Sequence, residues 1–176
     1  MNRLGDVTIS IRRARTADVP AMQQLLLPFI EQRILLGKEL VTLYESIQEF
    51  RVAEAPGGEL IGFGALHVFW EDLGEIRTLA VAQEWQQRGV GHLLLTALEA
   101  QARELGLSRL FCLTFEVEFF QRHGFEVIAD PGERLVDTET YYELVRSPDE
   151  GVAEFLDLAR VKQNTLGNSR MLKHLD

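Results

Sequence analysis

A glycine-containing loop near the middle of the chain restricts the fold more than any other feature. It reads Gln86-Gln87-Arg88-Gly89-Val90-Gly91. Residues 75–81 before it resemble a strand, and apolar residues after it recur at helical spacing as far as Gly106. The pattern predicts a strand, a loop and a helix, with glycines that let helix-start N–H groups approach an anion such as pyrophosphate. A tight turn that uses glycine only for its backbone freedom explains the spacing equally well.

Two better-known phosphate loops do not occur in the sequence. A Walker A loop needs Gly-Lys followed by Ser or Thr, and a dinucleotide-binding loop needs Gly-x-Gly-x-x-Gly. Neither pattern is found, and the loop at residues 86–91 does not follow the first strand of the chain. A P-loop nucleotidase and a dinucleotide-binding fold are therefore disfavoured.

The segments before the loop indicate mixed α and β structure. Residues 8–12 alternate like a strand, and residues 19–34 carry a helical stripe of apolar side chains. Pro28 interrupts that stripe, so we expect a kink or two short helices. Residues 50–53 and 60–70, separated by a Pro-Gly-Gly turn, are typical of a β-hairpin.

The segments after the loop continue the alternation of strands and helices. Residues 109–114 indicate a strand, and residues 116–123 indicate a short helix. We interpret residues 125–129 and 141–145 as a final strand pair. The order predicts an α+β or α/β-like sheet with helices on both faces.

The residues Ser147-Pro148-Asp149-Glu150 predict a second helix start. Serine would be the cap, proline would lie in the first turn, and Glu150 would close a capping box. Residues 162–176 are polar, and we expect a solvated or interface segment there. We therefore predict a domain over residues 1–146 and a C-terminal helical extension over residues 147–176. The extension docks on its own sheet or on a second subunit, and we expect a homodimer.

Charge and composition exclude several classes of protein. The net charge of -9 disfavours a nucleic-acid binder, and no apolar run reaches the roughly 20 residues that span a bilayer. The N-terminus lacks the apolar core of a signal peptide. The single cysteine, Cys112, cannot form an intrachain disulfide, and the four histidines show no metal-ligand spacing. We expect a cytoplasmic protein with no metal, no membrane partner and Cys112 in the core.

Three segments together resemble the GNAT acetyltransferase superfamily. They are residues 78–81, the loop with the helix start over residues 86–94, and residues 119–125, which end in Gly124-Phe125. The resemblance implies an acyl-CoA N-acyltransferase fold with a mixed central sheet. It also implies that acetyl-CoA is the co-substrate and that the loop at residues 86–91 holds its pyrophosphate.

A narrower resemblance is to the short, stand-alone N-acetylglutamate synthases. Residues 39–45, 70–78 and 113–120 carry it. Those enzymes acetylate the α-amine of glutamate, or of glutamine in some members, as the first step of arginine synthesis. The sequence does not choose between the two acceptors.

The resemblance implies a set of cofactor-binding residues from the strand and the loop. Backbone groups near residues 79–81 would meet the pantetheine arm, and one N–H there would polarise the thioester carbonyl. The full set is Leu79, Ala80, Val81, Gln86, Gln87, Arg88, Gly89, Val90, Gly91 and His92.

Glu75 is the candidate general base. Alternation along the strand puts Glu75, Arg77 and Leu79 on one face, and the resemblance places the catalytic glutamate of N-acetylglutamate synthases at this position. A carboxylate that is partly withdrawn from water holds a proton more tightly, which suits a base near neutral pH. The alternative is a surface glutamate paired with Arg77.

The sequence does not identify the general acid. Many GNAT enzymes place a tyrosine four residues before the glycine of the Gly-Phe pair, and here that position is Phe120, which has no proton to donate. Thr114 is a candidate hydroxyl donor, and a strand-end hydroxyl that caps the next helix explains it equally well. A CoA thiolate is also a tolerable leaving group, so water can serve.

An acidic acceptor calls for cations in its pocket. Lys38 lies in the segment that covers the acceptor site in this superfamily and is the first candidate, and Arg77 is the second. Arg33 and Arg122 are weaker candidates, and Arg88 is expected to face phosphate. Two other readings stay open: an N-acetyltransferase for another amine or peptide, and a CoA-binding sensor without catalysis.

Overall fold

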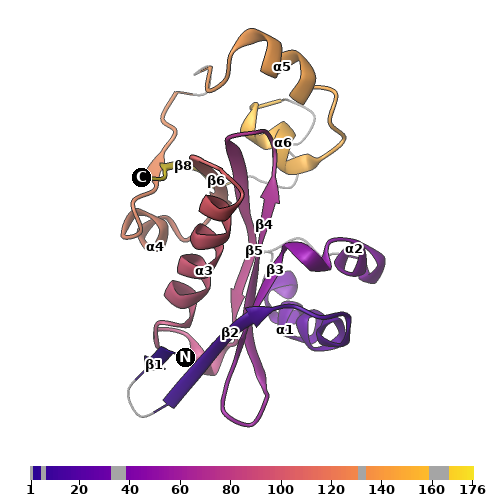
Figure 1. Cartoon of the computed structure of the whole chain (residues 1–176), viewed down its shortest axis with the longest axis vertical. Coiled ribbons are helices and arrows are strands. Elements are labelled where there is room, and N and C mark those ends of the chain that lie inside the picture. Colours follow the sequence, from indigo (N-terminus) through magenta and orange to yellow (C-terminus); the bar gives the residue numbers. More distant parts are fainter. Residues whose placement is uncertain (1, 5–6, 33–38, 131–133, 159–166) are drawn as a thin grey trace. The chain divides into compact units, whose positions relative to one another are not determined.

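The computed structural model describes residues 2–4, 7–32, 39–130, 134–158 and 167–176. Two compact units emerge, shown in Figure 1. The first consists of Met1–His67 and Ile76–Leu105, and the second of Val68–Glu75 and Gly106–Asp176. These points of division differ from the boundary that we expected between residues 146 and 147.

The strands of the first unit follow one another in chain order across one sheet, and the pairs from the first strand to the fourth are antiparallel. They are β1 (Asn2–Leu4), β2 (Val7–Arg13), β3 (Phe50–Glu54), β4 (Leu60–Val68) and the greater part of β5 (Leu73–Val81). The predicted hairpin is confirmed, because β3 and β4 pair in antiparallel register from Phe50↔Ala65 onward. Its turn uses Gly57 and Gly58 at φ 102° and 89°, a region where a side chain would be strained.

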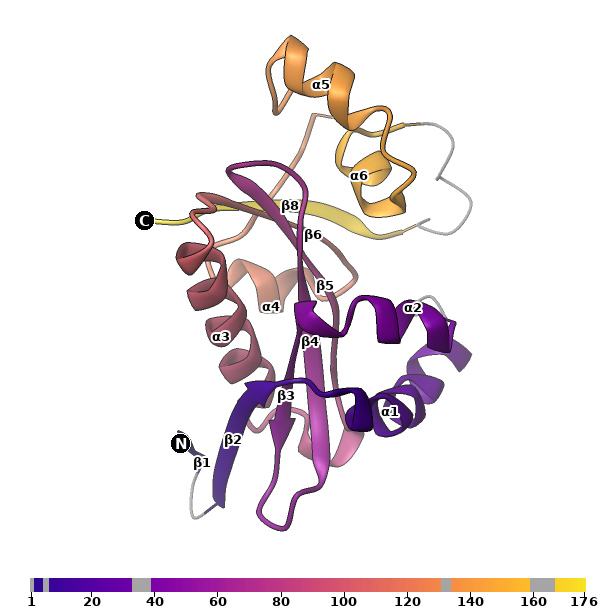
Figure 2. The same cartoon turned by 45° about the vertical axis from the view of Figure 1, so that its right-hand side comes forward.

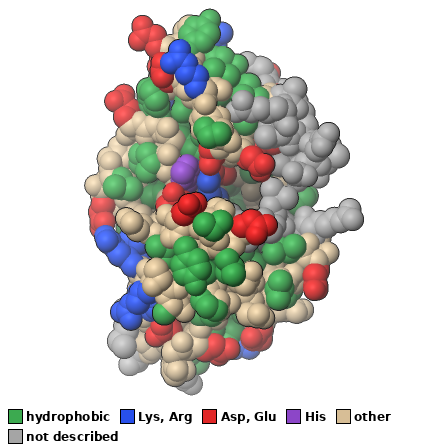
Figure 3. Space-filling model, turned by 90° about the vertical axis from the view of Figure 1, so that its right-hand side faces the viewer, with side chains coloured by type: hydrophobic (Ala, Val, Ile, Leu, Met, Phe, Trp, Pro, Cys, Tyr) green, Lys and Arg blue, Asp and Glu red, His purple; other side chains and the backbone are tan. Residues whose placement is uncertain are grey.

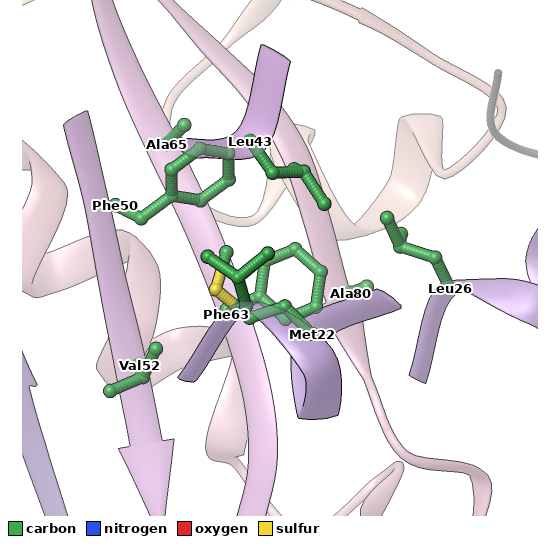
Figure 4. Close-up of a cluster of buried hydrophobic side chains, with 9 residues drawn as sticks. Met22, Leu26, Leu43, Phe50, Val52, Phe63, Ala65 and Ala80 are labelled. Carbon is green, nitrogen blue, oxygen red and sulfur yellow. The ribbon is translucent and has the colours of Figure 1, made fainter. Parts of the chain in front are cut away.

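Helices cover both faces of these strands, as predicted (Figures 1 and 2). On one face, α1 (Val19–Glu31) and α2 (Leu40–Glu45) bury a cluster that includes Met22, Leu43 and Phe63 (Figure 4). On the other face, α3 (Val90–Glu104) adds Val90 and Leu94 to a second cluster. Short 3₁₀ turns precede α1 (η1, Thr16–Asp18), β3 (η2, Ile47–Glu49) and α3 (η3, Gln83–Trp85).

Of the two outcomes expected at Pro28, the pair of short helices is wrong, because α1 runs as one helix from Val19 to Glu31, and the kink stays a prediction. Proline in a helix interior costs about 3 kcal/mol. Complete burial of Val19, Met22 and Leu26 offsets that cost, since each buried side chain contributes about 1.5–3 kcal/mol.

The second unit is built on the strand β6 (Arg109–Thr114). It pairs in parallel with the start of β5, at Leu73–Glu75, and in antiparallel with β8 (Ser169–His174). β7 (Glu126–Val127) pairs with β8. Parallel and antiparallel pairs therefore coexist, and the predicted mixed sheet is confirmed.

Two predictions for this unit are wrong. Residues 141–145 do not form the partner strand of β7, because they fall mainly in the helix α5 (Thr138–Leu144). The partner is β8, which lies in the tail that we expected to be solvated. The helix α6 (Glu150–Phe155) is capped by Asp149, whose side chain accepts from the N–H of Val152 at 3.0 Å, and not by Ser147.

The core of the second unit joins α5 and α6 to one side of β6 and β8, as Figure 2 shows. Phe111 and Phe155 meet edge to face at 5.4 Å between ring centroids. On the other side, α4 (Val117–Gln121) precedes Phe125, whose ring meets that of Phe120 at 5.1 Å.

Candidate functional site

The predicted anion loop lies in the first unit, between the end of β5 and the start of α3. Gly89 is the N-cap of α3 at φ 83°, so α3 begins at Val90, within the predicted loop. The first bond of the helix runs from the Leu93 N–H to the Gly89 carbonyl at 3.1 Å. The N–H groups before that bond have no acceptor within the helix, and glycine has no side chain to cap them. This geometry suits an anion with closely spaced oxygens.

The rest of the loop is held in a defined shape. The Gln86 side-chain amide donates to the Val81 carbonyl at 3.2 Å, which ties the loop back to the end of β5. Gln87 has φ 59°, a left-handed conformation that costs a non-glycine residue about 1–2 kcal/mol. The Arg88 guanidinium lies 5.3 Å from the centroid of the Trp85 ring, so Trp85 orients the arginine that we expected to face phosphate.

The strand β5 contains an irregularity that the sequence analysis missed. Thr78 has φ 55°, which interrupts the regular alternation after Arg77. Leu79 and Val81 pack with the α3-side cluster, and Ala80 packs with the α1-side cluster. The predicted common face of Glu75, Arg77 and Leu79 therefore cannot be read from simple alternation.

The sequence analysis also missed the role of two glycines of β4, which let the end of β5 lie close to β4. A Cβ atom on Gly64 would fall 2.8 Å from Leu79 Cδ1, and a Cβ atom on Gly62 would fall 3.0 Å from the Ala80 carbonyl oxygen. Both distances are shorter than ordinary contacts. The close packing of residues 79–81 thus depends on glycine in the neighbouring strand.

Glu75 lies in the second unit, at the end of the parallel register, where it pairs with Phe111. It is only 6% exposed, so it is not the surface glutamate of the alternative interpretation. Burial, and after it the charge of Glu75, raises the pKa of the Cys112 thiol. Cys112 itself is fully buried, as expected of a core residue.

Thr114, the candidate acid, and Phe120, which stands where many GNAT enzymes have a tyrosine, are both buried in the second unit. The Thr114 hydroxyl accepts a hydrogen bond from the Glu116 N–H at 2.9 Å, which agrees with its interpretation as a strand-end cap. Phe120 is 5% exposed and packs edge to face against Phe119 and Phe125.

Two of the four cations that we considered for the acceptor pocket lie within the described residues. Lys38 and Arg33 lie outside the described residues. Arg77 is partly buried on β5, and Arg122 is exposed after α4. In the first unit, His67 Nδ1 lies 2.6 Å from Glu49 Oε1, a hydrogen bond that sequence spacing does not reveal because 18 residues separate the two.

A polar cavity of about 400 Å³ lies elsewhere in the second unit, beside Trp70 and Val136. One of its two arginines, Arg109, donates to the Asp72 carboxylate at 2.8 Å and to the Leu135 carbonyl at 2.6 Å. No residue predicted to bind cofactor or acceptor lines it.

Figure 3 shows a face on which the described Lys and Arg side chains are interspersed with acidic and apolar ones. Within the described ranges, no group of three or more His, Cys, Asp or Glu side chains is arranged to hold a metal ion. None of the described helices is long and apolar enough to cross a membrane.

Comparison with known sequences finds clear relatives. The acetyltransferase (GNAT) family matches residues 24–125. An amino-acid acetyltransferase of Mycobacterium tuberculosis is 56% identical over 165 residues, which is 92% of each chain. An amino-acid acetyltransferase of Neisseria meningitidis is 40% identical over 124 residues, and the match covers 69% of this chain but 28% of that longer protein.

Solved structures give the same result. The crystal structure of Rv2747 from Mycobacterium tuberculosis, in complex with CoA and NLQ, matches with a TM-score of 0.86 and 53% identity, over 95% of this chain and 99% of that one. An N-acetylglutamate synthase from Neisseria gonorrhoeae, complexed with coenzyme A and N-acetyl-glutamate, matches with a TM-score of 0.76 and 29% identity. That match covers 98% of this chain and 36% of the synthase.

Proposed function

Because this chain belongs to the acetyltransferase (GNAT) family, we propose that it transfers the acetyl group of acetyl-CoA to the α-amine of L-glutamate or L-glutamine. The chain is an N-acetyltransferase that uses acetyl-CoA. The amino-acid acceptor is supported by the names of its relatives and by the N-acetyl-glutamate bound to the Neisseria gonorrhoeae synthase. The structural observation that carries the proposal is the N-terminus of α3, where Gly89 leaves the first N–H groups uncapped.

That helix start would hold the pyrophosphate of acetyl-CoA. Backbone N–H groups of the loop and the positive end of the α3 dipole attract the phosphate oxygens without needing a net positive surface. This explains how a protein of net charge -9 can bind a polyanionic cofactor. Arg88, oriented by Trp85, would add a cation at the rim of the loop.

Glu75 would act as the general base. The acceptor ammonium gives one proton to its carboxylate, and the free amine then attacks the carbonyl carbon of the thioester. A C–N bond forms as the C–S bond breaks, and the second proton of the nitrogen passes to the departing thiolate. Burial of Glu75 supports this role, because a carboxylate shielded from water is a stronger base toward a bound ammonium.

The departing thiolate needs little help. Its pKa is about 8.5, so it leaves readily near neutral pH, and the proton released by the nitrogen reaches it directly or through water. Thr114 stays our only side-chain candidate for the acid, and its bond from the Glu116 N–H supports a structural role at least as well.

Lys38 and Arg77 would bind the carboxylates of the acceptor, because both are cations and Arg77 lies two residues from Glu75 on β5. We also propose that the reaction is the first step of arginine synthesis, in the cytoplasm, and that the protein is a homodimer. These assignments rest on the resemblance of residues 39–45 and 70–78 to N-acetylglutamate synthases.

Incubation of the protein with acetyl-CoA and each amino acid in turn, with thiol release as the readout, tests the proposal. We expect release with glutamate, glutamine or both, and none above background with the other amino acids. Release only with a polyamine or a peptide amine would instead identify a different acceptor class.

A further inference from the structure

Arg170 is an unexpected cation in the core of the second unit. It lies on β8, in register with Leu113 of β6, and it is only partly exposed. One guanidinium nitrogen, Nη2, donates to the carbonyl of Phe155, the last residue of α6. A cation at a helix C-terminus is favourable in itself, so this contact explains one of its donors.

A second donor of Arg170 is not explained in this way. Its Nε is buried and has no acceptor within the described ranges. Leaving a buried donor of a charged group without a partner costs more than an ordinary hydrogen bond contributes. The unit therefore carries a buried N–H that a bound acceptor group would satisfy.

The register places this guanidinium on the same sheet face as Glu75. Directly paired residues in a sheet point to the same side, and residues alternate along a strand. Glu75 pairs with Phe111, Phe111 pairs with Leu172, and Leu113 pairs with Arg170. Phe111, Leu113 and Leu172 all pack in the cluster that α5 and α6 cover, so the register places Glu75 and Arg170 on that side as well.

The separation of the two residues suits a small ligand. Glu75 and Arg170 are two strands and two residues apart, which corresponds to a Cα–Cα distance of about 12 Å. Two long side chains that point to the same side across this distance can reach the two ends of one bound amino acid. Arg170 also lies toward the carboxyl end of the β5–β6 pair, where ligands of open sheets commonly bind.

We propose that Arg170 binds a carboxylate of the amino-acid acceptor through its Nε–H, while Glu75 receives the proton of the acceptor amine. This inference rests on the proposed function and adds a residue that fixes acceptor specificity. Glutamate has two carboxylates, on Cα and at the end of its side chain, and either can fill the role. A guanidinium suits a carboxylate better than an ammonium does, because its donors are planar and fixed in direction.

The test compares glutamate with two acceptors that lack one carboxylate each, glutamine and the α-amide of glutamate. Each is assayed with the parent protein, Arg170→Met and Arg170→Lys. Lys173→Met, on the same strand, is the control, because Lys173 lies near the Phe125 ring at 5.8 Å and outside the proposed site. Thermal unfolding of every variant shows whether loss of the bond to Phe155 has affected the fold.

In the parent, replacing the bound carboxylate by an amide should raise the acceptor KM by roughly 10- to 100-fold, the range for a hydrogen bond to a charged group. In Arg170→Met that replacement should have little further effect, and Arg170→Lys should recover part of the affinity. The KM for acetyl-CoA should be unchanged.

An equal effect of both amides in the parent and in Arg170→Met would overturn the assignment. So would a rise in the acetyl-CoA KM alone, which would place Arg170 near the CoA phosphates. If the parent acetylates no amino acid at all, the proposed function fails and the role of Arg170 falls with it. An active parent with unaffected Arg170 variants contradicts only this inference.

Discussion

Cys112 is fully buried beside β5, close enough to Glu75 for the charge of that carboxylate to raise the pKa of the thiol, in addition to the larger effect of burial. The two residues come from adjacent strands of the second unit, since Glu75 pairs with Phe111 in parallel register.

The raised pKa predicts an alkaline loss of stability. Below pH 9.0, the ordinary value for this thiol, Cys112 is protonated in both the folded and the unfolded chain. Above it, the unfolded thiol ionises while the folded one does not, so the free energy of unfolding falls with rising pH. Urea unfolding at pH 8 and pH 10 should show this fall, and Cys112→Ala should reduce it. An identical pH dependence in the variant would show that the thiol is not linked to folding.

Glu75→Gln should lower kcat by about 10²–10⁴-fold, the usual contribution of a general base. The KM for acetyl-CoA should change little, because the loop that would bind it is in the first unit. Steady-state kinetics over pH 6–9 measures both quantities. Glu99→Gln on α3 is a suitable control, since the Glu99 side chain is also largely buried, at 12% exposed. Retention of parental turnover by Glu75→Gln across the pH range would refute the role as base.

Gly89→Ala should both destabilise the fold and weaken acetyl-CoA binding. Alanine at φ 83° is strained by about 1–2 kcal/mol, and its methyl group stands where an anion would approach. Gly106→Ala provides the matched control, because Gly106 has φ 84°, a Cβ there would meet nothing within 4 Å, and it follows the far end of α3.

Thermal unfolding and the KM for acetyl-CoA separate the two effects. Both variants should lose similar stability, and only Gly89→Ala should show a raised KM. Equal KM values in the two variants would mean that glycine serves only the turn at the start of α3.

Lys38→Ala should raise the KM for the acceptor by about 10-fold or more, because a lost charge-assisted hydrogen bond is worth about 1.5–3 kcal/mol. The KM for acetyl-CoA should stay near the parental value. Arg122→Ala, which removes an exposed cation after α4, is the control. If the acceptor KM is the same in Lys38→Ala and in the parent, Lys38 does not bind the acceptor.

The loop and the strand before it were predictable because their signals are local. Glycines at a strand-to-helix junction and an apolar stripe after it mark both elements within 20 residues. The left-handed Thr78 was not predictable, because threonine has no preference for that conformation and tertiary packing imposes it. The role of the glycines at 62 and 64 was not predictable either, because it depends on which residues of the neighbouring strand lie against them.

The predictions for the C-terminal part of the chain were wrong for two different reasons. β8 pairs with β6 across more than 50 residues of sequence, and its mixed residues show no alternation strong enough to reveal a strand. The two tyrosines of α5 favour a strand, because aromatic residues are common in strands, but the residue before the helix is a good N-cap. The Asp137 side chain caps it by accepting from the Thr140 N–H at 3.0 Å.

The most direct test of the proposed activity is the identity of the product. The protein is incubated with acetyl-CoA labelled in the acetyl group and with an equimolar mixture of amino acids, and the products are separated and identified by mass. We predict labelled N-acetylglutamate, N-acetylglutamine or both as the main product. Label on another amine, or thiol release without an acetylated amino acid, would contradict the proposed function.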